Sequence, residues 1–169
     1  MTIATEAVPG IERLDALPDG AADRELLGCC GSRTWARRMA SARPFVTLER
    51  LLEAADATWR SLPESDWRQA LDSHPRIGDL TAEGQAAEEQ NAALSGSDED
   101  ARLLAEANRE YEARFGRIFI VCAAGRTVPQ ILEACRQRLS NDPAAELHIA
   151  AEEQRRITRL RLEKMARGR

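Results

Sequence analysis

The chain has 169 residues, of which 43% are apolar, so its length and composition fit one domain (1–169) with a buried core. Charged residues make up 31% and aromatic residues 4%, and the abundance of Ala, Leu, Arg and Glu favours helices, so we expect an all-α, single-domain bundle of roughly eight to nine helices. The net charge of −4, with arginines spread along the chain, argues against nucleic-acid binding, which requires a concentrated basic surface.

The first part of the chain predicts two helices separated by a break. Residues 11–17 carry apolar side chains at helical spacing, and Asp19 and Gly20 are expected to break that helix. A second helix is expected over residues 21–27. Gly28 and Gly31, which bracket Cys29 and Cys30, then predict a bend, because glycine is conformationally permissive.

Capping residues and prolines define the next three helices. Ser32 and Thr47 are placed to cap helices, because their hydroxyl groups can accept hydrogen bonds from backbone N–H groups. Pro44 ends the first of these helices, and the second is strongly amphipathic. A third begins at Pro63 and ends before Pro75, since proline disfavours the helical conformation in the residue that precedes it.

The second half of the chain predicts an irregular loop over 76–84, a short helix over 86–94 and a long helix that begins at Asp98 and ends at Gly116. Residues 118–124 are then all apolar, which is typical of a buried strand. Because no second strand is expected, we predict one buried extended segment there instead.

Two further helices complete the predicted fold. Thr127 and Pro129 suit the cap and first turn of the first of them. Asp142 and Pro143 are placed to open the last helix of the chain.

Several familiar signatures of function are absent. The four cysteines lack the paired spacing of a zinc site, so we interpret them as reduced core thiols and expect no metal. The sequence has no Gly-rich phosphate loop, no GxSxG motif and no HExxH motif. It shows no apolar run that approaches a membrane span and no signal peptide, which predicts a cytoplasmic protein that does not bind a membrane.

Two histidines are the first candidates for chemistry, because an imidazole titrates close to neutral pH. His74 lies where a predicted helix gives way to a loop, a place where active residues tend to occur. The alternative is that His74 only terminates the helix. His148 lies in a charged stretch of the last helix, and we interpret it as a solvated residue.

Glu88, Glu89 and Gln90 follow the predicted loop closely enough for a carboxylate to reach the imidazole of His74. Such a contact fixes the tautomer of an imidazole and raises its pKa, as a general acid or base requires. The alternative is a run of solvated charges. The residues by themselves therefore predict a helical domain with a candidate His and Glu, and no particular reaction.

Taken together, separate segments of the chain resemble the 2-oxo-4-hydroxy-4-carboxy-5-ureidoimidazoline (OHCU) decarboxylase family. The resemblance extends from about Ile11 to about Met165, and the shared order of its segments makes it specific. The residues that carry it are Cys29, Cys30, Gly31, Ser32, Trp35, Arg43, Pro44, Phe45, Trp67, Ala70, His74, Pro75, Arg76, Ile77, Gly78, Glu89, Gln90, Asn108, Tyr111, Phe115, Gly116, Phe119, Ile120, Ile157, Leu160, Arg161 and Leu162.

The resemblance implies an all-helical enzyme, usually a homodimer, that needs no metal or organic cofactor. It implies the decarboxylation of OHCU to (S)-allantoin and CO₂ during urate degradation. The family's His, Glu and Arg correspond here to His74, Glu89 and Arg161. We expect His74 to act as general acid and base, Glu89 to orient it, and Arg161 to bind anionic oxygens through its planar fork.

The resemblance also implies a set of substrate-binding positions. In an extended segment, free backbone N–H groups could face ligand oxygens. Ala86 departs from the family, which commonly has Ser three residues before the Glu, so one hydroxyl contact is lost. The implied positions are Pro75, Gln90 and the backbone of Phe119, Ile120, Val121, Cys122 and Ala123.

Two other interpretations remain open at this point. A helical interaction or regulatory domain could keep the fold and lack the activity, and the Ala86 departure favours it. The retained His74, Glu89 and Arg161 set argues against it. Alternatively, the same scaffold could act on a different ureido acid or purine-derived acid.

Overall fold

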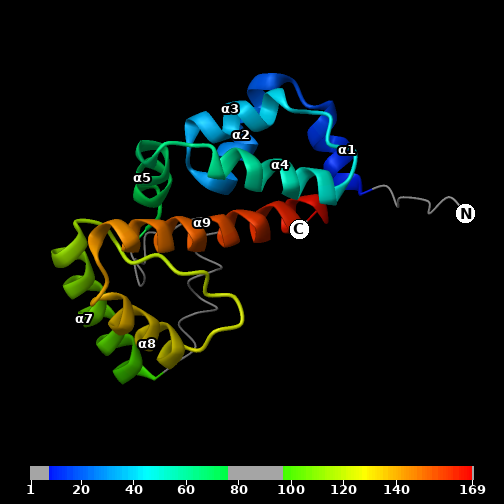
Figure 1. The fold of residues 1–169 in the computed structure, drawn as a ribbon. Helices are drawn as coiled ribbons and strands as arrows, with labels where there is room; N and C mark the ends of the chain where they lie inside the picture. The colour runs from blue at the N-terminus through cyan, green and yellow to red at the C-terminus, as the bar shows by residue number, and fades with distance from the viewer. Residues whose placement is uncertain (1–7, 76–96, 169) are drawn as a thin grey trace, which may run out of the picture. The chain divides into compact units, whose positions relative to one another are not determined.

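The computed structural model describes residues 8–75 and 97–168. These residues form eight α-helices and contain no β-strand, which confirms the all-α class (Figure 1). The loop predicted over 76–84 and the helix predicted over 86–94 lie outside the described residues.

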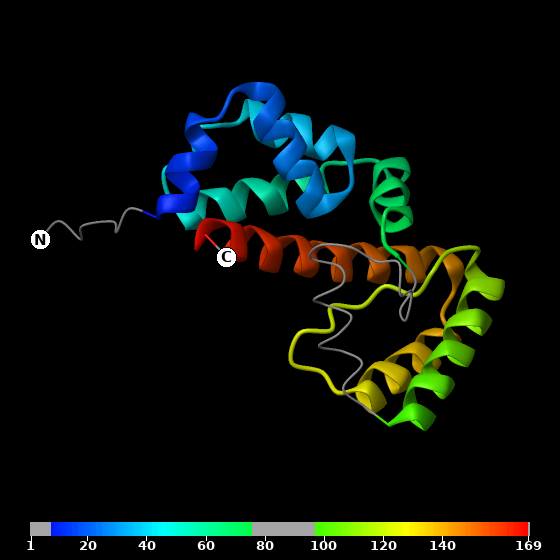
Figure 2. The same cartoon turned by 180° about the vertical axis from the view of Figure 1, so that it is seen from behind.

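The described helices belong to two compact units. The first unit comprises Met1–Ala70 with Arg155–Arg169, and the second comprises Leu71–Gln154. The expectation of one domain over 1–169 stays a prediction. The helices of the first unit are α1 (Pro9–Ala16), α2 (Asp19–Cys30), α3 (Arg33–Ser41) and α4 (Leu48–Arg60). The second unit holds α7 (Asp98–Phe115) and α8 (Val128–Arg138), and α5 (Glu64–Asp72) and α9 (Pro143–Ala166) contribute residues to both units (Figures 1 and 2).

The course of α2 corrects two predictions. Asp19 and Gly20 are the first residues of α2, so the break lies just before them. The helix also extends past the predicted 21–27, through Gly28, and the predicted bend lies at Gly31, which ends α2 with a φ of 85°. A glycine inside a helix costs only about 1 kcal/mol relative to alanine. Burial of one face of α2 outweighs that cost.

The predicted caps of the first unit are confirmed. Ser32 Oγ accepts a hydrogen bond from Trp35 N at 3.1 Å and begins α3. Thr47 Oγ1 accepts one from Arg50 N at 3.2 Å and begins α4. Each bond satisfies a backbone donor that has no partner within the helix.

The second unit follows the same local rules. Gly116, with a φ of 68°, ends α7 as predicted. Thr127 and Gln130 form a reciprocal capping box at the start of α8. Asp142 Oδ2 accepts a hydrogen bond from Ala144 N at 3.0 Å and opens α9.

The predicted buried extended segment lies between α7 and α8, which pack against each other. Residues 118–124 have no regular secondary structure and form part of the yellow connection in Figure 1. Phe119 and Val121 belong to the same buried cluster as Tyr111 of α7 and Ile131 of α8. The prediction is therefore confirmed, and the alternating side chains of the segment supply part of the core of this unit.

A buried ion pair joins the elements around this segment. Arg138 donates from Nε and Nη2 to Oε1 of Glu146 at 2.7 and 2.5 Å, and the two residues are only 8% and 0% exposed. Tyr111 donates its hydroxyl to the same oxygen at 2.5 Å, and burial, together with that bond, raises the pKa of Tyr111 to about 12. Arg138 Nη1 also donates to Ile120 O at 2.7 Å. The pair therefore fixes the backbone of the extended segment as well as three helices.

The approach of α1 to the end of α9 depends on a glycine in the first unit. A Cβ atom on Gly10 would lie 2.2 Å from Met165 O and 2.5 Å from Ala166 O. These are backbone atoms, so any side chain at position 10 forces the two helices apart.

We predict that Glu146→Gln lowers the free energy of unfolding by about 3–5 kcal/mol, because the guanidinium of Arg138 stays buried without its counter-charge. Denaturant titration followed by far-UV circular dichroism measures the change. The control is Glu99→Gln, which removes an exposed pair with Arg102 and should leave stability almost unchanged. Equal effects of the two substitutions would contradict the structural role of the buried pair.

We predict that Gly10→Ala destabilises the fold by about 1–3 kcal/mol through overpacking. The matched control is Gly28→Ala, where an added Cβ meets no atom within 4 Å and should stabilise α2 by about 0.5–1 kcal/mol. Thermal unfolding of the two variants beside the wild type checks the opposite signs. A Gly10→Ala protein as stable as the wild type would rule out the close approach.

Candidate active site

His74 lies just beyond the C-terminal end of α5, as its position before Pro75 predicts. The backbone N–H of His74 donates to Leu71 O at 3.3 Å and forms a turn at the end of α5. The side chain is half-buried, and its Nε2 lies 2.5 Å from Oε1 of Gln154 on α9. Gln154 is fully buried. The imidazole is therefore held by a long-range contact and does not merely terminate a helix.

The neighbour of Gln154 on α9 holds the extended segment. Glu153 Oε2 accepts a hydrogen bond from Cys122 N at 2.7 Å, and the Glu153 side chain is 9% exposed. Arg126 Nη2 lies 3.8 Å from the other carboxylate oxygen and partly balances its charge. Consecutive residues of α9 thus contact the candidate imidazole and the candidate substrate-binding segment, all within the second unit.

The sequence predicts that the backbone N–H groups of the extended segment are free to bind a ligand, and one of them is not. Cys122 donates its N–H to Glu153, so this group is not available to a ligand. Within the described part of the chain, the N–H groups of Phe119, Ile120 and Val121 make no hydrogen bond, although these residues are buried. Most backbone donors of buried residues have a partner in the protein or in ordered water, so these N–H groups are open to a ligand or to water.

Arg161 is buried at 7% exposure in the C-terminal part of α9. Its Nη1 lies 3.4 Å from Cys29 O in the first unit. His74 belongs to the second unit, so the convergence of His74 with Arg161 stays a prediction. Glu89 and Gln90 lie outside the described residues, and so does Ala86.

The remaining predicted residues have simpler surroundings. Pro75 follows His74 directly and is half-buried. His148 is exposed, as predicted for a solvated residue. None of the four cysteines, all of which the structure describes, forms a disulfide; Cys29, Cys30 and Cys135 are buried, and Cys122 is half-buried. Burial raises the pKa of the Cys30 and Cys135 thiols to about 11, which keeps them protonated and inert.

The sequence reasoning missed Glu153 and Gln154, which lie in a charged stretch of the last helix. A signal was nevertheless present. Gln154 follows Ala150 by four residues and precedes Ile157 by three, so helical periodicity puts it on the same buried face. A polar residue in the apolar stripe of a helix indicates a buried partner.

Neither a metal site nor a membrane span is found among residues 8–75 and 97–168. No group of three or more His, Cys, Asp or Glu side chains there is arranged to hold a metal ion. None of the helices described has the length and apolar character needed to cross a bilayer.

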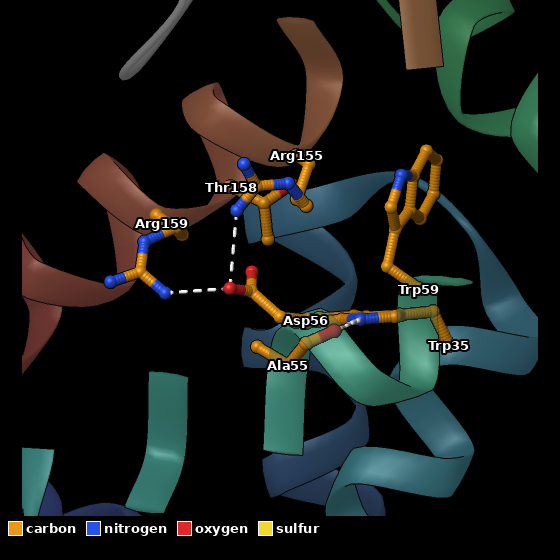
Figure 3. A pocket seen from close by; sticks show the side chains of 7 residues that line it. All are labelled: Trp35, Ala55, Asp56, Trp59, Arg155, Thr158 and Arg159. Carbon is orange, nitrogen blue, oxygen red and sulfur yellow. Dashed lines mark hydrogen bonds and ion pairs between the residues drawn. The ribbon is translucent and has the colours of Figure 1, made fainter. Parts of the chain in front are cut away.

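A hollow in the first unit is lined by tryptophan and charged residues. Asp56 Oδ2 accepts from Arg155 Nη1 at 3.1 Å and from Arg159 Nη1 at 2.8 Å (Figure 3). Trp35 and Trp59 line the same hollow. It is too narrow to hold a water molecule, so we interpret the Asp56 cluster as structural.

Comparison with known proteins identifies a consistent set of relatives. A family model for OHCU decarboxylase matches residues 15–163. The chain is 37% identical over 145 residues to the uric acid degradation bifunctional protein TTL of Arabidopsis thaliana, and the match covers 81% of the chain and 45% of that protein. The chain thus spans less than half of this longer relative.

Two further matches each cover most of this chain and most of the relative. The 2-oxo-4-hydroxy-4-carboxy-5-ureidoimidazoline decarboxylase of Amia calva is 34% identical over 131 residues, which is 73% of the chain and 74% of that protein. A crystal structure of OHCU decarboxylase in the presence of (S)-allantoin is similar with a TM-score of 0.75 and 38% identity, covering 83% of the chain and 95% of that structure.

We predict that Glu153→Ala speeds hydrogen exchange of the Cys122 amide by about tenfold or more, because the acceptor of that N–H is removed. Amide exchange measured by NMR or mass spectrometry reports the change at the segment. Glu152→Ala, at the exposed neighbouring position, should leave the exchange rate unchanged. Equal protection in both variants would show that Glu153 does not hold the segment.

Proposed function

The chain belongs to the OHCU decarboxylase family, and from this premise we propose that it converts OHCU to (S)-allantoin and CO₂ in urate degradation. The observation that carries the proposal is the arrangement on α9, where Gln154 contacts His74 and Glu153 contacts Cys122. This arrangement brings a half-buried imidazole and a set of unpaired backbone donors into one unit.

The reaction suits these residue types. OHCU carries its carboxylate on a ring carbon that also bears a hydroxyl group. When the bond to the carboxylate breaks, CO₂ leaves and the electron pair passes into the conjugated ring. A proton must then add to a ring carbon on one face of the planar intermediate, and the hydroxyl group must lose its proton to become a carbonyl, to give (S)-allantoin. We propose that His74 moves the hydroxyl proton and acts as the general acid and base.

The other proposed contacts orient the imidazole and bind the substrate. Glu89 would orient His74, and Arg161 would bind anionic oxygens through its planar guanidinium. The burial of Arg161 supports this role, because a desolvated guanidinium binds an anion more strongly than an exposed one. Pro75 and Gln90 would line the substrate-binding site. Ala86 has no hydroxyl group and would make no hydrogen bond to the substrate through its side chain.

The unpaired amides of the extended segment support the same proposal. Phe119, Ile120, Val121 and Ala123 have N–H groups that donate to no other described residue, and we propose that some of them bind substrate oxygens. Cys122 would contribute through its backbone position and not through its N–H. No step of this scheme requires a cofactor.

We further propose that the protein acts as a cytoplasmic homodimer on this small-molecule substrate, without a nucleic-acid or membrane partner. The family resemblance supports the dimer, and the acidic net charge of −4 supports the absence of nucleic acid. Light scattering coupled to size-exclusion chromatography gives the molar mass that tests the dimer.

We predict that His74→Ala lowers the rate of (S)-allantoin formation by about a hundredfold or more. OHCU is generated in place by fresh enzymatic urate oxidation and hydroxyisourate hydrolysis, and circular dichroism follows the chirality of the product. His148→Ala is the matched control and should retain wild-type activity, since His148 is exposed.

Two outcomes of this assay would contradict the proposal. If His74→Ala still formed enantiopure allantoin at the wild-type rate, the role given to His74 would be wrong. If the wild type formed only racemic product at the uncatalysed rate, the activity itself would be wrong, and a non-catalytic domain would be the better interpretation.

A further inference from the structure

We propose that Gln154 is a positioning residue that fixes the tautomer of His74, so that Nε2 always carries a proton and Nδ1 is the nitrogen that exchanges the proton in catalysis. The tautomer is inferred from the contact between Nε2 of His74 and Oε1 of Gln154. Its consequence for the reaction rests on the decarboxylase function proposed above.

The first step of the argument is the direction of the hydrogen bond. Nε2 of His74 lies 2.5 Å from Oε1 of Gln154, and an amide oxygen can only accept. With Oε1 facing the ring, the imidazole is the donor, which places a proton on Nε2 in both the neutral and the cationic form. In the neutral form the lone pair is then on Nδ1.

The second step is the rigidity of the acceptor. Gln154 is fully buried, and Leu147, Ala150 and Ala151, which precede it on α9, are buried as well. A side chain in a packed interior keeps few rotamers, so the amide has little freedom to turn away from the imidazole. The contact thus restricts the orientation of the His74 ring as well as the position of its proton.

The third step is the charge of the acceptor. Gln154 is neutral, so it directs the Nε2 proton without adding a negative charge beside the imidazole. A carboxylate in the same place would also accept the bond, but it would stabilise the cationic imidazole as well. The amide therefore fixes the Nε2 proton without adding a charge of its own, and the proposed Glu89 carboxylate, which would have to act through Nδ1, would be the group that favours the cationic imidazole.

The fourth step is the use of neighbouring residues. Glu153 accepts from Cys122 N at 2.7 Å, and the next residue, Gln154, contacts His74. Successive side chains on a helix project about 100° apart, which lets one turn of α9 reach both groups. The orientation of the imidazole is therefore set relative to the extended segment, where we propose that the substrate binds.

Direct observation of the tautomer tests the proposal in the ligand-free protein. The chain has two histidines, so a His148→Gln background leaves one imidazole to observe. Long-range ¹H–¹⁵N correlation spectra of ¹⁵N-labelled protein distinguish the two neutral tautomers. We expect Nε2–H in this background, the same tautomer in Gln154→Glu, and a mixture in Gln154→Leu.

Steady-state kinetics supply the second measurement. Gln154→Leu should lower kcat about tenfold to a hundredfold with little change in KM, as for loss of a group that orients a functional imidazole. Gln154→Glu keeps an acceptor and should retain more of kcat than Gln154→Leu. It also keeps the test decisive if the leucine variant fails to fold. Glu152→Gln, an exposed neighbour on α9, should match the wild type in both measurements.

Two results would overturn the proposal. One is an Nδ1–H tautomer in the wild-type side chain, which would mean that the amide nitrogen of Gln154 faces the ring. The other is an unchanged tautomer and kcat in Gln154→Leu. An Nε2–H imidazole in a protein that does not turn over OHCU would support the tautomer assignment and refute only the decarboxylase function.

Discussion

The second unit depends on one buried ion pair, between Arg138 and Glu146. An extended apolar segment without a partner strand leaves its backbone groups unsatisfied, and burial makes each of them costly. Arg138 satisfies one of these backbone groups, because it donates to Ile120 O while it pairs with Glu146. Tyr111 donates to the same carboxylate. Elements from four parts of the chain are thereby held in register, and the segment keeps a fixed path without a sheet.

The long helix α9 supplies the side chains that contact the candidate site residues in this unit. Glu153 and Gln154 are buried polar residues on a helix whose other inward positions are largely apolar, and each reaches a different target. Burial of polar side chains is favourable only when they are hydrogen-bonded, so both contacts are selected by the same energetic rule that stabilises the core. The buried side of α9 therefore both packs in the core and contacts the candidate site residues.

Local features of this fold were predictable, and contacts between distant segments were not. The caps at Ser32 and Thr47 follow from side chains that act within one turn, so sequence alone predicts them. The helix α2 continues through Gly28 and ends only at Gly31, because tertiary packing outweighs the weak local preference of one glycine against a helix. His74 was found from its place before Pro75, whereas its partner lies 80 residues away and no local pattern connects the two. The role of Arg161 came from family resemblance alone.

The bond from Cys122 N to Glu153 also limits the shape of molecule that the segment could recognise. In an extended chain, successive N–H groups point to opposite sides. In such geometry the amides of Phe119, Val121 and Ala123 would lie on the side opposite to the Cys122 N–H that Glu153 binds, with alternate donors about 6.6–6.8 Å apart. Two oxygens of a single carboxylate are too close together to bridge that spacing. Donors at that spacing would suit a flat molecule with acceptors at both ends, whereas a compact anion would contact only one of them.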